Sequence, residues 1–232
     1  MSKYINLIGV ELEGSWARIS RDVAIVPDQS VRIVEGYRHA GELVSPPMDL
    51  ESIKVWLERH IPQGVNETCG YHIHVSLKKF RDYNRLTSMR FYTLLLKRIR
   101  QWGLAADISP RHHFWQRLEG TFTFTTPGGN TRNFCRKEFL PEAQIYEVKK
   151  GGDGAARHCH LNFCYSLHGT VELRLFPAWS NYEHYVGSLQ VFIDAIEEFL
   201  VAEDQRRENK VRIKIGATPR RPLRQLYQEK WA

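Results

Sequence analysis

Three short polar pairs that recur along the chain constrain its fold more than any other feature. They are Glu11-Leu12-Glu13, His72-Ile73-His74 and Glu172-Leu173-Arg174, and in each pair one apolar residue separates two polar ones. On a β-strand, residues i and i+2 leave the same face about 6.6 Å apart. The pattern therefore predicts three strands whose polar side chains line one face of a sheet while the intervening residues enter a core.

The residues around these pairs extend the prediction to whole elements. Strands are expected over Lys3–Glu13, with Ile8, Val10 and Leu12 on one face, and over Cys69–Leu77. Further strands are predicted at Val23–Val26, Ser30–Val34 and Arg38–Ser45, the last ending at Pro46-Pro47 because proline cannot donate to a ladder. Helical spacing predicts helices over Asp49–His60 and Asn84–Trp102, and a terminal helix marked by Tyr185, Leu189, Phe192, Ile196, Phe199 and Leu200.

A hairpin is predicted around His168-Gly169, within Arg157–Phe176. A three-residue loop, Leu167–Gly169, with Gly169 in the left-handed conformation, would place Glu172 opposite Cys164 and Arg174 opposite Asn162. This register gathers the polar residues on one face: His158, His160, Asn162, Glu172 and Arg174. Arg157 has the opposite parity, so it must precede the strand or follow a bulge.

Composition bounds the class of protein. With 232 residues, of which 42% are apolar, the chain suits one compact domain over residues 1–205. No apolar run is long enough to span a membrane and the start leads directly into a predicted strand, so we expect a soluble, cytoplasmic protein. The four cysteines lack paired zinc spacing, which favours reduced thiols, with Cys69 and Cys164 as packing residues.

The net charge of +7 is concentrated in a basic C-terminal segment, residues 206–232. This segment holds nine Lys and Arg residues against two acids, whereas basic and acidic residues balance in the rest of the chain. A basic tail is most often solvated, but this one could also recruit an acidic macromolecule or nucleic acid.

The polar residues favour a metal and phosphate site. Mg²⁺ and Mn²⁺ prefer carboxylate oxygen and tolerate imidazole, and Arg174 and Arg157 could clamp phosphate oxygens. Each pair alone is common on a solvated sheet face, but three pairs on three strands favour a site. The predicted metal ligands are Glu11, Glu13, Glu42, His72 and Glu172.

Five motifs in this order resemble those of the amidoligases, members of the carboxylate–amine ligase superfamily with glutamine synthetase and glutamate–cysteine ligase. The motifs are Gly9–Glu13, Gly41–Pro47, Cys69–Val75, Leu161-Asn162 and Gly169–Phe176. The resemblance implies an α+β fold: a glutamine synthetase-like curved antiparallel β-sheet with helices packed on its convex face. Its concave face would hold ATP and two or three Mg²⁺ ions.

The resemblance also implies roles for individual residues. It places the metal ligands at the five positions above, with Glu11, Glu172 and Arg174 closest to the chemistry and Arg174 beside the transferred phosphoryl group. It places His74, Arg157 and Asn162 beside nucleotide or substrate. The implied reaction joins a small-molecule or peptide carboxylate to an amine through an acyl phosphate made from ATP.

Two other functions stay open at this point. A zinc hydrolase could use His72 and His74 with Glu11 or Glu172. A nucleic-acid-binding protein would need only the basic tail. Residues 103–154 are expected to act as a lid and specificity element because loops beside a site often do so. Assembly into oligomers is compatible with the resemblance.

Overall fold

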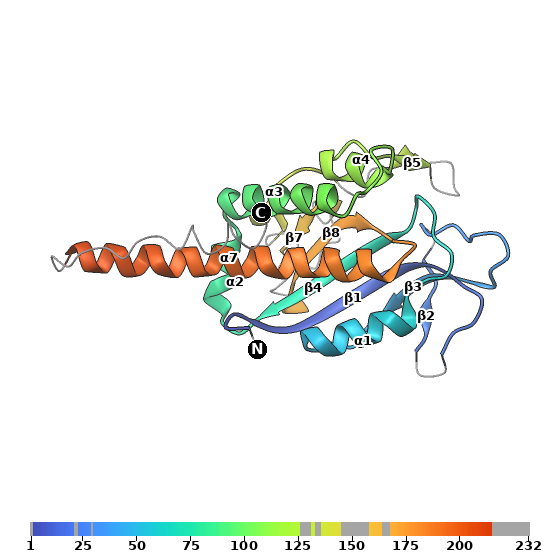
Figure 1. Cartoon of the computed structure of the whole chain (residues 1–232), viewed down its shortest axis with the longest axis horizontal. Helices are drawn as coiled ribbons and strands as arrows, with labels where there is room; N and C mark the ends of the chain where they lie inside the picture. Colours follow the sequence, from blue (N-terminus) through green and yellow to red (C-terminus); the bar gives the residue numbers. More distant parts are fainter. Residues whose placement is uncertain are drawn as a thin grey trace.

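The computed structural model describes residues 2–20, 23–28, 30–125, 131–132, 136–144, 158–163 and 168–214. Its centre is a six-stranded antiparallel sheet with the strand order β2-β3-β1-β4-β8-β7 (Figure 1). The strands are β1 (Ile5–Trp16), β2 (Ile25–Val26), β3 (His39–Val44), β4 (Gly70–Leu77), β7 (Leu161–Asn162) and β8 (Val171–Pro177). A separate two-stranded ribbon pairs β5 (Phe124–Thr125) with β6 (Thr131–Arg132).

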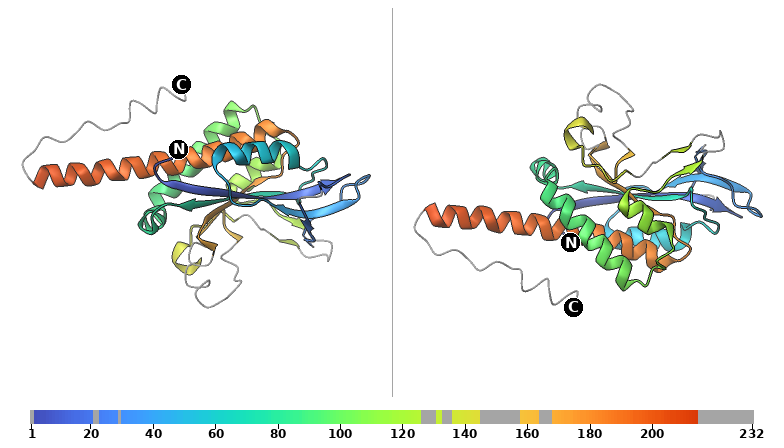
Figure 2. Two further views of the ribbon diagram at one scale, coloured as in Figure 1. Left: turned by 90° about the horizontal axis from the view of Figure 1, so that it is seen from below. Right: turned by 90° about the horizontal axis from the view of Figure 1, so that it is seen from above.

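The predicted alternation of the three central strands is confirmed. The apolar residue within each polar pair, Leu12, Ile73 or Leu173, is fully buried. The helices α1 (Leu50–His60), α3 (Met89–Ala105) and α7 (Tyr182–Lys214) cover this face, as the edge-on views of Figure 2 show. The opposite face of the sheet is therefore left to the polar residues.

Two predicted helices form where the sequence places them. Helix α1 begins after Asp49, whose carboxylate accepts the backbone N–H groups of Glu51 and Ser52 and so satisfies the first turn. Helix α7 buries the whole predicted apolar set, from Tyr185 to Leu200, against α3 and the sheet. It then continues without a break to Lys214, past the expected end of the domain at residue 205.

The helix predicted over Asn84–Trp102 is wrong as a single element. The chain forms α2 (Phe80–Leu86) and then α3, which starts at Met89. The side chain of Ser88 accepts the N–H of Arg90 at 3.2 Å and starts a new helix, because serine satisfies the free N–H groups of a first turn. Helix α4 (His113–Glu119) follows and ends at Gly120, whose φ of 70° is left-handed.

The strand predicted at Ser30–Val34 is also wrong. The backbone N–H of Arg32 donates to the Thr68 hydroxyl at 3.1 Å, and that of Val34 donates to the Ser15 hydroxyl at 3.0 Å. These side chains replace a neighbouring strand as partners, so the segment lies as a loop beside β1.

The β7–β8 pair forms in a register two residues away from the predicted one. Asn162, not Cys164, lies opposite Glu172, and Leu161 lies opposite Leu173. Gly169 does adopt the left-handed conformation, with φ of 68°. The Gln144 side chain accepts the N–H of Phe163 at 3.1 Å and donates to the Leu161 carbonyl at 3.0 Å, so it bonds to the outer edge of β7 as a neighbouring strand would.

The structure bears on two further expectations, about the cysteines and about membrane spans, for the described residues only. Cys69 and Cys159 are buried free thiols, whereas Cys164 lies outside the described residues. Among the described helices, none has the length and apolar character needed to cross a membrane.

Candidate functional site

The polar face of the sheet collects side chains from five neighbouring strands. The register sets Glu11 opposite His72, Glu13 opposite Glu42, and His74 opposite Glu172. Opposite residues of an antiparallel pair share a face with Cβ atoms about 5 Å apart. Sequence positions more than 150 residues apart therefore converge in one patch.

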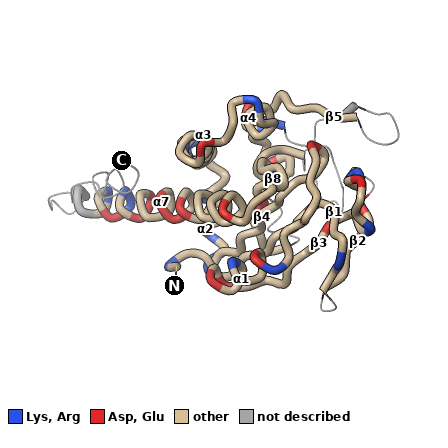
Figure 3. Tube along the Cα trace, turned by 45° about the vertical axis from the view of Figure 1, so that its right-hand side comes forward, with Lys and Arg blue, Asp and Glu red and all other residues tan. Residues whose placement is uncertain are grey.

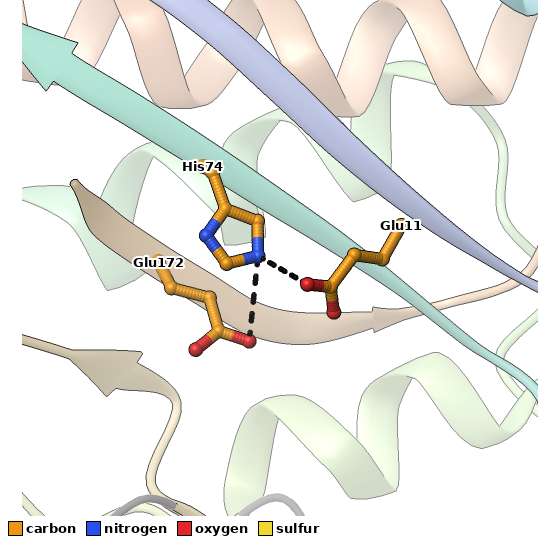
Figure 4. A group of neighbouring side chains, drawn as sticks. All are labelled: Glu11, His74 and Glu172. Atoms are coloured by element: carbon orange, nitrogen blue, oxygen red, sulfur yellow. Dashed lines mark ion pairs between the residues drawn. The ribbon is translucent and has the colours of Figure 1, made fainter. Parts of the chain in front are cut away.

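The first carboxylate group consists of Glu11, His74 and Glu172, which project from β1, β4 and β8 toward one another (Figure 4). One ligand atom from each residue lies within 4.8 Å of the others. His74 Nε2 is 2.9 Å from Glu11 Oε1 and 3.8 Å from Glu172 Oε1. The His74 Nδ1 atom lies 3.3 Å from the Thr170 hydroxyl, which orients the ring.

The carboxylates of this group are held in their charged form. Burial, the largest effect on Glu11, raises its pKa, but hydrogen bonds from His72 and His74 outweigh burial and lower the pKa well below its ordinary value. Burial likewise raises the pKa of Glu172, and the positive charges of Arg174 and then the two histidines outweigh it to lower that pKa. The group is thus prepared to bind a cation.

The second carboxylate group consists of Glu13, Asp28 and Glu42, whose ligand oxygens also lie within 4.8 Å of one another. Glu13 and Glu42 face each other on β1 and β3, and Asp28 reaches them from the loop after β2. The Ser30 N–H and hydroxyl both donate to Asp28 Oδ1 at 2.7 Å and fix this carboxylate.

Glu42 responds to the negative charge around it. Burial, with added repulsion from Glu11, Glu13 and Asp28, raises the pKa of Glu42 to about 7. When several carboxylates lie this close together, ionising all of them costs free energy unless a positive charge binds among them. The group therefore has the composition and the electrostatics of a site for a hard divalent cation.

The His72 ring lies between the two groups. Its Nδ1 is 2.8 Å from Glu11 Oε2 and its Nε2 is 3.7 Å from Glu13 Oε1. The N–H of Gly70 donates to Glu13 Oε2 at 2.5 Å, and a Cβ atom at residue 70 would lie 2.9 Å from His72 Nε2. Glycine is needed at this position, because a side chain there would push the imidazole and the carboxylate apart.

A bulge in β8 aims Arg174 at the patch. Tyr71 pairs with Phe176 and Ile73 pairs with Leu173, so β8 holds one more residue than β4 opposite His72. The Arg174 guanidinium donates to Glu172 Oε1. Burial alone lowers the pKa of Arg174, but the charges of Glu172, Glu11 and Glu13 outweigh it and raise the pKa further.

The remaining predicted residues have different outcomes. Asn162 donates from Nδ2 to Glu172 Oε2 at 2.9 Å, so it belongs to the patch. His160 does not: it is fully buried, with Nδ1 3.0 Å from the Tyr92 hydroxyl and Nε2 2.7 Å from the Arg117 carbonyl. Arg157 lies outside the described residues, as do residues 126–130, 133–135 and 145–154 of the expected lid.

Asp28 is not among the ligands predicted from the sequence. No periodic pattern includes this residue, because it follows β2 in a loop whose path depends on contacts with β1. The one available signal is its place directly after a strand that pairs with the Glu42 strand.

Comparisons with known proteins bear on the identity of the chain. The family model described as "Putative amidoligase enzyme" matches residues 15–192. Searches of curated proteins and of solved structures each found no significant match. The matched range includes Glu42, His72, His74, Asn162, Glu172 and Arg174, and begins two residues after Glu13. Because the match spans well over half of the sequence and its motifs meet on one face of the sheet, the chain belongs to the amidoligase family.

Proposed function

We propose that this protein is an ATP-dependent carboxylate–amine ligase. ATP phosphorylates a substrate carboxylate, and an amine then displaces phosphate from the acyl carbon to give an amide or peptide bond. The observation that carries the proposal is the pair of carboxylate groups side by side on one sheet face of a chain from the amidoligase family.

The donor atoms fit Mg²⁺ or Mn²⁺. Carboxylate oxygens dominate both groups, and imidazole enters only through His74 and the neighbouring His72. In the proposal, Glu11, His74 and Glu172 hold one cation, and Glu13, Asp28 and Glu42 hold another. Bound cations of this kind neutralise the phosphate chain during transfer. The sequence predicted His72 as the imidazole ligand; in the proposal His74 takes that place, and His72 positions one carboxylate of each group.

Arg174 is proposed to bind the phosphoryl group that is transferred. Its guanidinium already has Glu172 on one side, and its buried Nε has no hydrogen-bond partner among the described residues. A fixed fork of donors suits phosphate oxygens. Asn162 and His74 are proposed to lie beside the nucleotide or substrate, as is Arg157.

The two steps need no protein nucleophile. A carboxylate oxygen of the substrate attacks the γ-phosphorus and ADP leaves; the amine nitrogen then attacks the acyl carbon, inorganic phosphate leaves and the ammonium proton is lost. Positioned donors and cations are the main requirement for such transfer. Cys69 is unsuited to covalent catalysis because burial raises the pKa of its thiol to about 11.

A zinc hydrolase is the second candidate. It is favoured by the approach of both His72 and His74 to the Glu11 carboxylate, at 2.8 and 2.9 Å. Such an enzyme would use a single ion and would have no role for Glu13, Asp28 and Glu42. The second carboxylate group therefore favours the ligase.

Calorimetric titration of ATP with and without Mg²⁺ tests the proposal. The wild type is expected to bind ATP only with Mg²⁺, and Glu11→Gln/Glu172→Gln is expected to lose this binding. The control, Glu51→Gln/Glu58→Gln, removes two carboxylates from exposed positions of α1 on the opposite face and should bind as the wild type does. Circular dichroism establishes that each variant is folded.

Three outcomes would contradict the ligase. The first is no ATP binding by the wild type, the second is Mg²⁺-dependent binding that survives in the site variant, and the third is equal loss in the control. Stoichiometric zinc that stays bound through dialysis, together with no ATP binding, would favour the hydrolase.

A further inference from the structure

The distal part of helix α7, residues 205–214, extends away from the core of the domain. Leu200 is its last buried residue, and every described side chain from Val201 to Val211 is exposed or only partly covered. Figure 1 shows this end of the helix extending well beyond the sheet and the other helices. A long solvent-exposed extension of a core helix leaves a surface that another molecule can reach.

The charge of α7 changes sign along this extension. Three of its acidic residues pair with bases of the body: Glu198 with Arg98, Glu203 with Arg90, and Asp204 with Lys3 and Arg85. After Asp204 the sequence of the helix carries Arg206, Arg207, Lys210, Arg212 and Lys214 against Glu208 alone. Figure 3 shows basic positions in blue toward the described end of α7. These acids are thus paired within the domain, Glu203 also with Arg206, and the basic stretch that follows keeps an excess of positive charge.

Four of these five basic positions share one side of the helix. Positions 206, 210 and 214 follow i, i+4, i+8 spacing, position 207 lies next to them, and the stretch spans about 12 Å. Arg206, Arg207 and Lys210 are exposed, and neither Arg207 nor Lys210 makes an ion pair with a described residue. We name positions 206, 207, 210 and 214 the basic stripe.

We propose that the basic stripe binds the phosphate backbone of nucleic acid. This binding is separate from the ligase site and does not depend on it. The stripe continues in the sequence into Arg220, Arg221, Arg224 and Lys230, so six of the nine bases after residue 205 are arginine. The arginine fork matches phosphate oxygens, and a linear array of positive charge matches a linear polyanion.

Two other occupants fit less well. A membrane-surface helix needs a broad apolar face, but Val211 and Ile213 are the only apolar residues between 206 and 214, and Val211 is 58% exposed. An acidic protein would suit the charge, and its carboxylates would also fit the arginine fork, but it lacks the regular linear array of phosphates that a row of bases on a helix matches. An acidic polypeptide therefore serves as a competitor in the binding experiment.

The first experiment measures binding by fluorescence anisotropy. Nuclease-treated full-length protein is titrated into a labelled 20-nucleotide single strand of mixed sequence and into its duplex, at 50 and 200 mM NaCl. If the four bases of the stripe contact phosphates, this rise in salt should weaken binding about 50-fold for the single strand and about 150-fold for the duplex.

The matched variants locate the surface. Arg206→Gln/Arg207→Gln/Lys210→Gln/Lys214→Gln should weaken binding at 50 mM NaCl by at least 30-fold and reduce the salt dependence. The control removes four exposed bases from the body, Arg38→Gln/Arg59→Gln/Lys97→Gln/Arg111→Gln, and should stay within threefold of the wild type.

Both variants should retain Mg²⁺-dependent ATP binding, and Glu11→Gln/Glu172→Gln should retain nucleic-acid binding, so the two proposals fail independently. The inference is overturned if the wild type does not bind either oligonucleotide at 50 mM NaCl. It is also overturned if the stripe variant binds as tightly as the control, or if polyglutamate competes as well as an unlabelled oligonucleotide. The last result would assign the stripe to an acidic protein partner.

Discussion

Arg117 is predicted to support both the fold and the second carboxylate group. This α4 residue is buried, and its guanidinium donates to the carbonyls of Glu67 and Cys69 at 3.2 Å and of Phe176 at 3.5 Å. Its guanidinium carbon also lies 4.9 Å from the centroid of the Phe122 ring. A single side chain thus joins α4 to the start of β4 and the end of β8.

Replacing Arg117 with methionine keeps most of the apolar stem and removes the three hydrogen bonds. Bonds to a charged donor contribute about 1.5–3 kcal/mol each, and the relief of a buried charge offsets part of that loss. We expect a net loss of about 3 kcal/mol in the free energy of unfolding, which lowers Tm by about 6–12 °C for a chain of this size. Arg117→Lys keeps the charge but not the fork, and should lose about half as much.

The assay is thermal unfolding followed by circular dichroism, with exposed Arg111→Met as the control. Because the Cys69 carbonyl immediately precedes Gly70, whose N–H holds Glu13, Arg117→Met should also weaken Mn²⁺ binding. A Tm within 2 °C of the wild type would refute this reasoning, since it would mean that the three carbonyls find equal partners without the guanidinium.

Three further predictions address pH, packing and capping. The pKa of Glu42 is raised from 4.5 to about 7 in the folded state, so between these pH values the native state binds more protons than the unfolded state. The free energy of unfolding of the metal-free protein should therefore fall as pH rises from 4.5 to 7. Urea unfolding at pH 5 and 8 should show this decline in the wild type and a smaller decline in Glu42→Gln. Ile73 lies between His72 and His74 in the sequence and is fully buried. In urea unfolding, Ile73→Val should lower the free energy of unfolding by about 1 kcal/mol and Ile73→Ala by about 3 kcal/mol. Equal losses would argue against tight packing around this side chain. Asp49→Ala should lower the urea midpoint of unfolding, whereas Asp49→Ser should preserve the cap and the midpoint. An identical loss in both variants would show that the cap is not the cause.

The central strands could be predicted from sequence because a β-strand has a strict period of two. Leu12, Ile73 and Leu173 each lie between the two residues of a polar pair. When these three side chains are buried in the core, the polar side chains beside them must point to the opposite face of the sheet. The apolar positions of α7 and the Asp49 cap of α1 are equally local signals. Most of the candidate site follows from these local patterns, because the polar residues occupy the face of the sheet that is not packed against the helices.

The parts that were missed depend on contacts between distant segments. Asp28 joins the second carboxylate group because its loop is fixed by Ser15 and Thr68, which no periodicity can indicate. The outer edge of β7 bonds to the Gln144 amide, which comes from a segment outside the predicted strands. In both cases a side chain takes the role of a strand partner, and such replacements leave no repeating pattern in the sequence.

The measurement that tests the central claim most directly is a crystal structure with Mn²⁺ and a non-hydrolysable ATP analogue. The account predicts anomalous peaks within the two carboxylate groups, one between Glu11, His74 and Glu172 and one between Glu13, Asp28 and Glu42, with the γ-phosphate beside Arg174. A single ion held by His72 and His74 with no nucleotide on this face, or a nucleotide bound elsewhere, would contradict it.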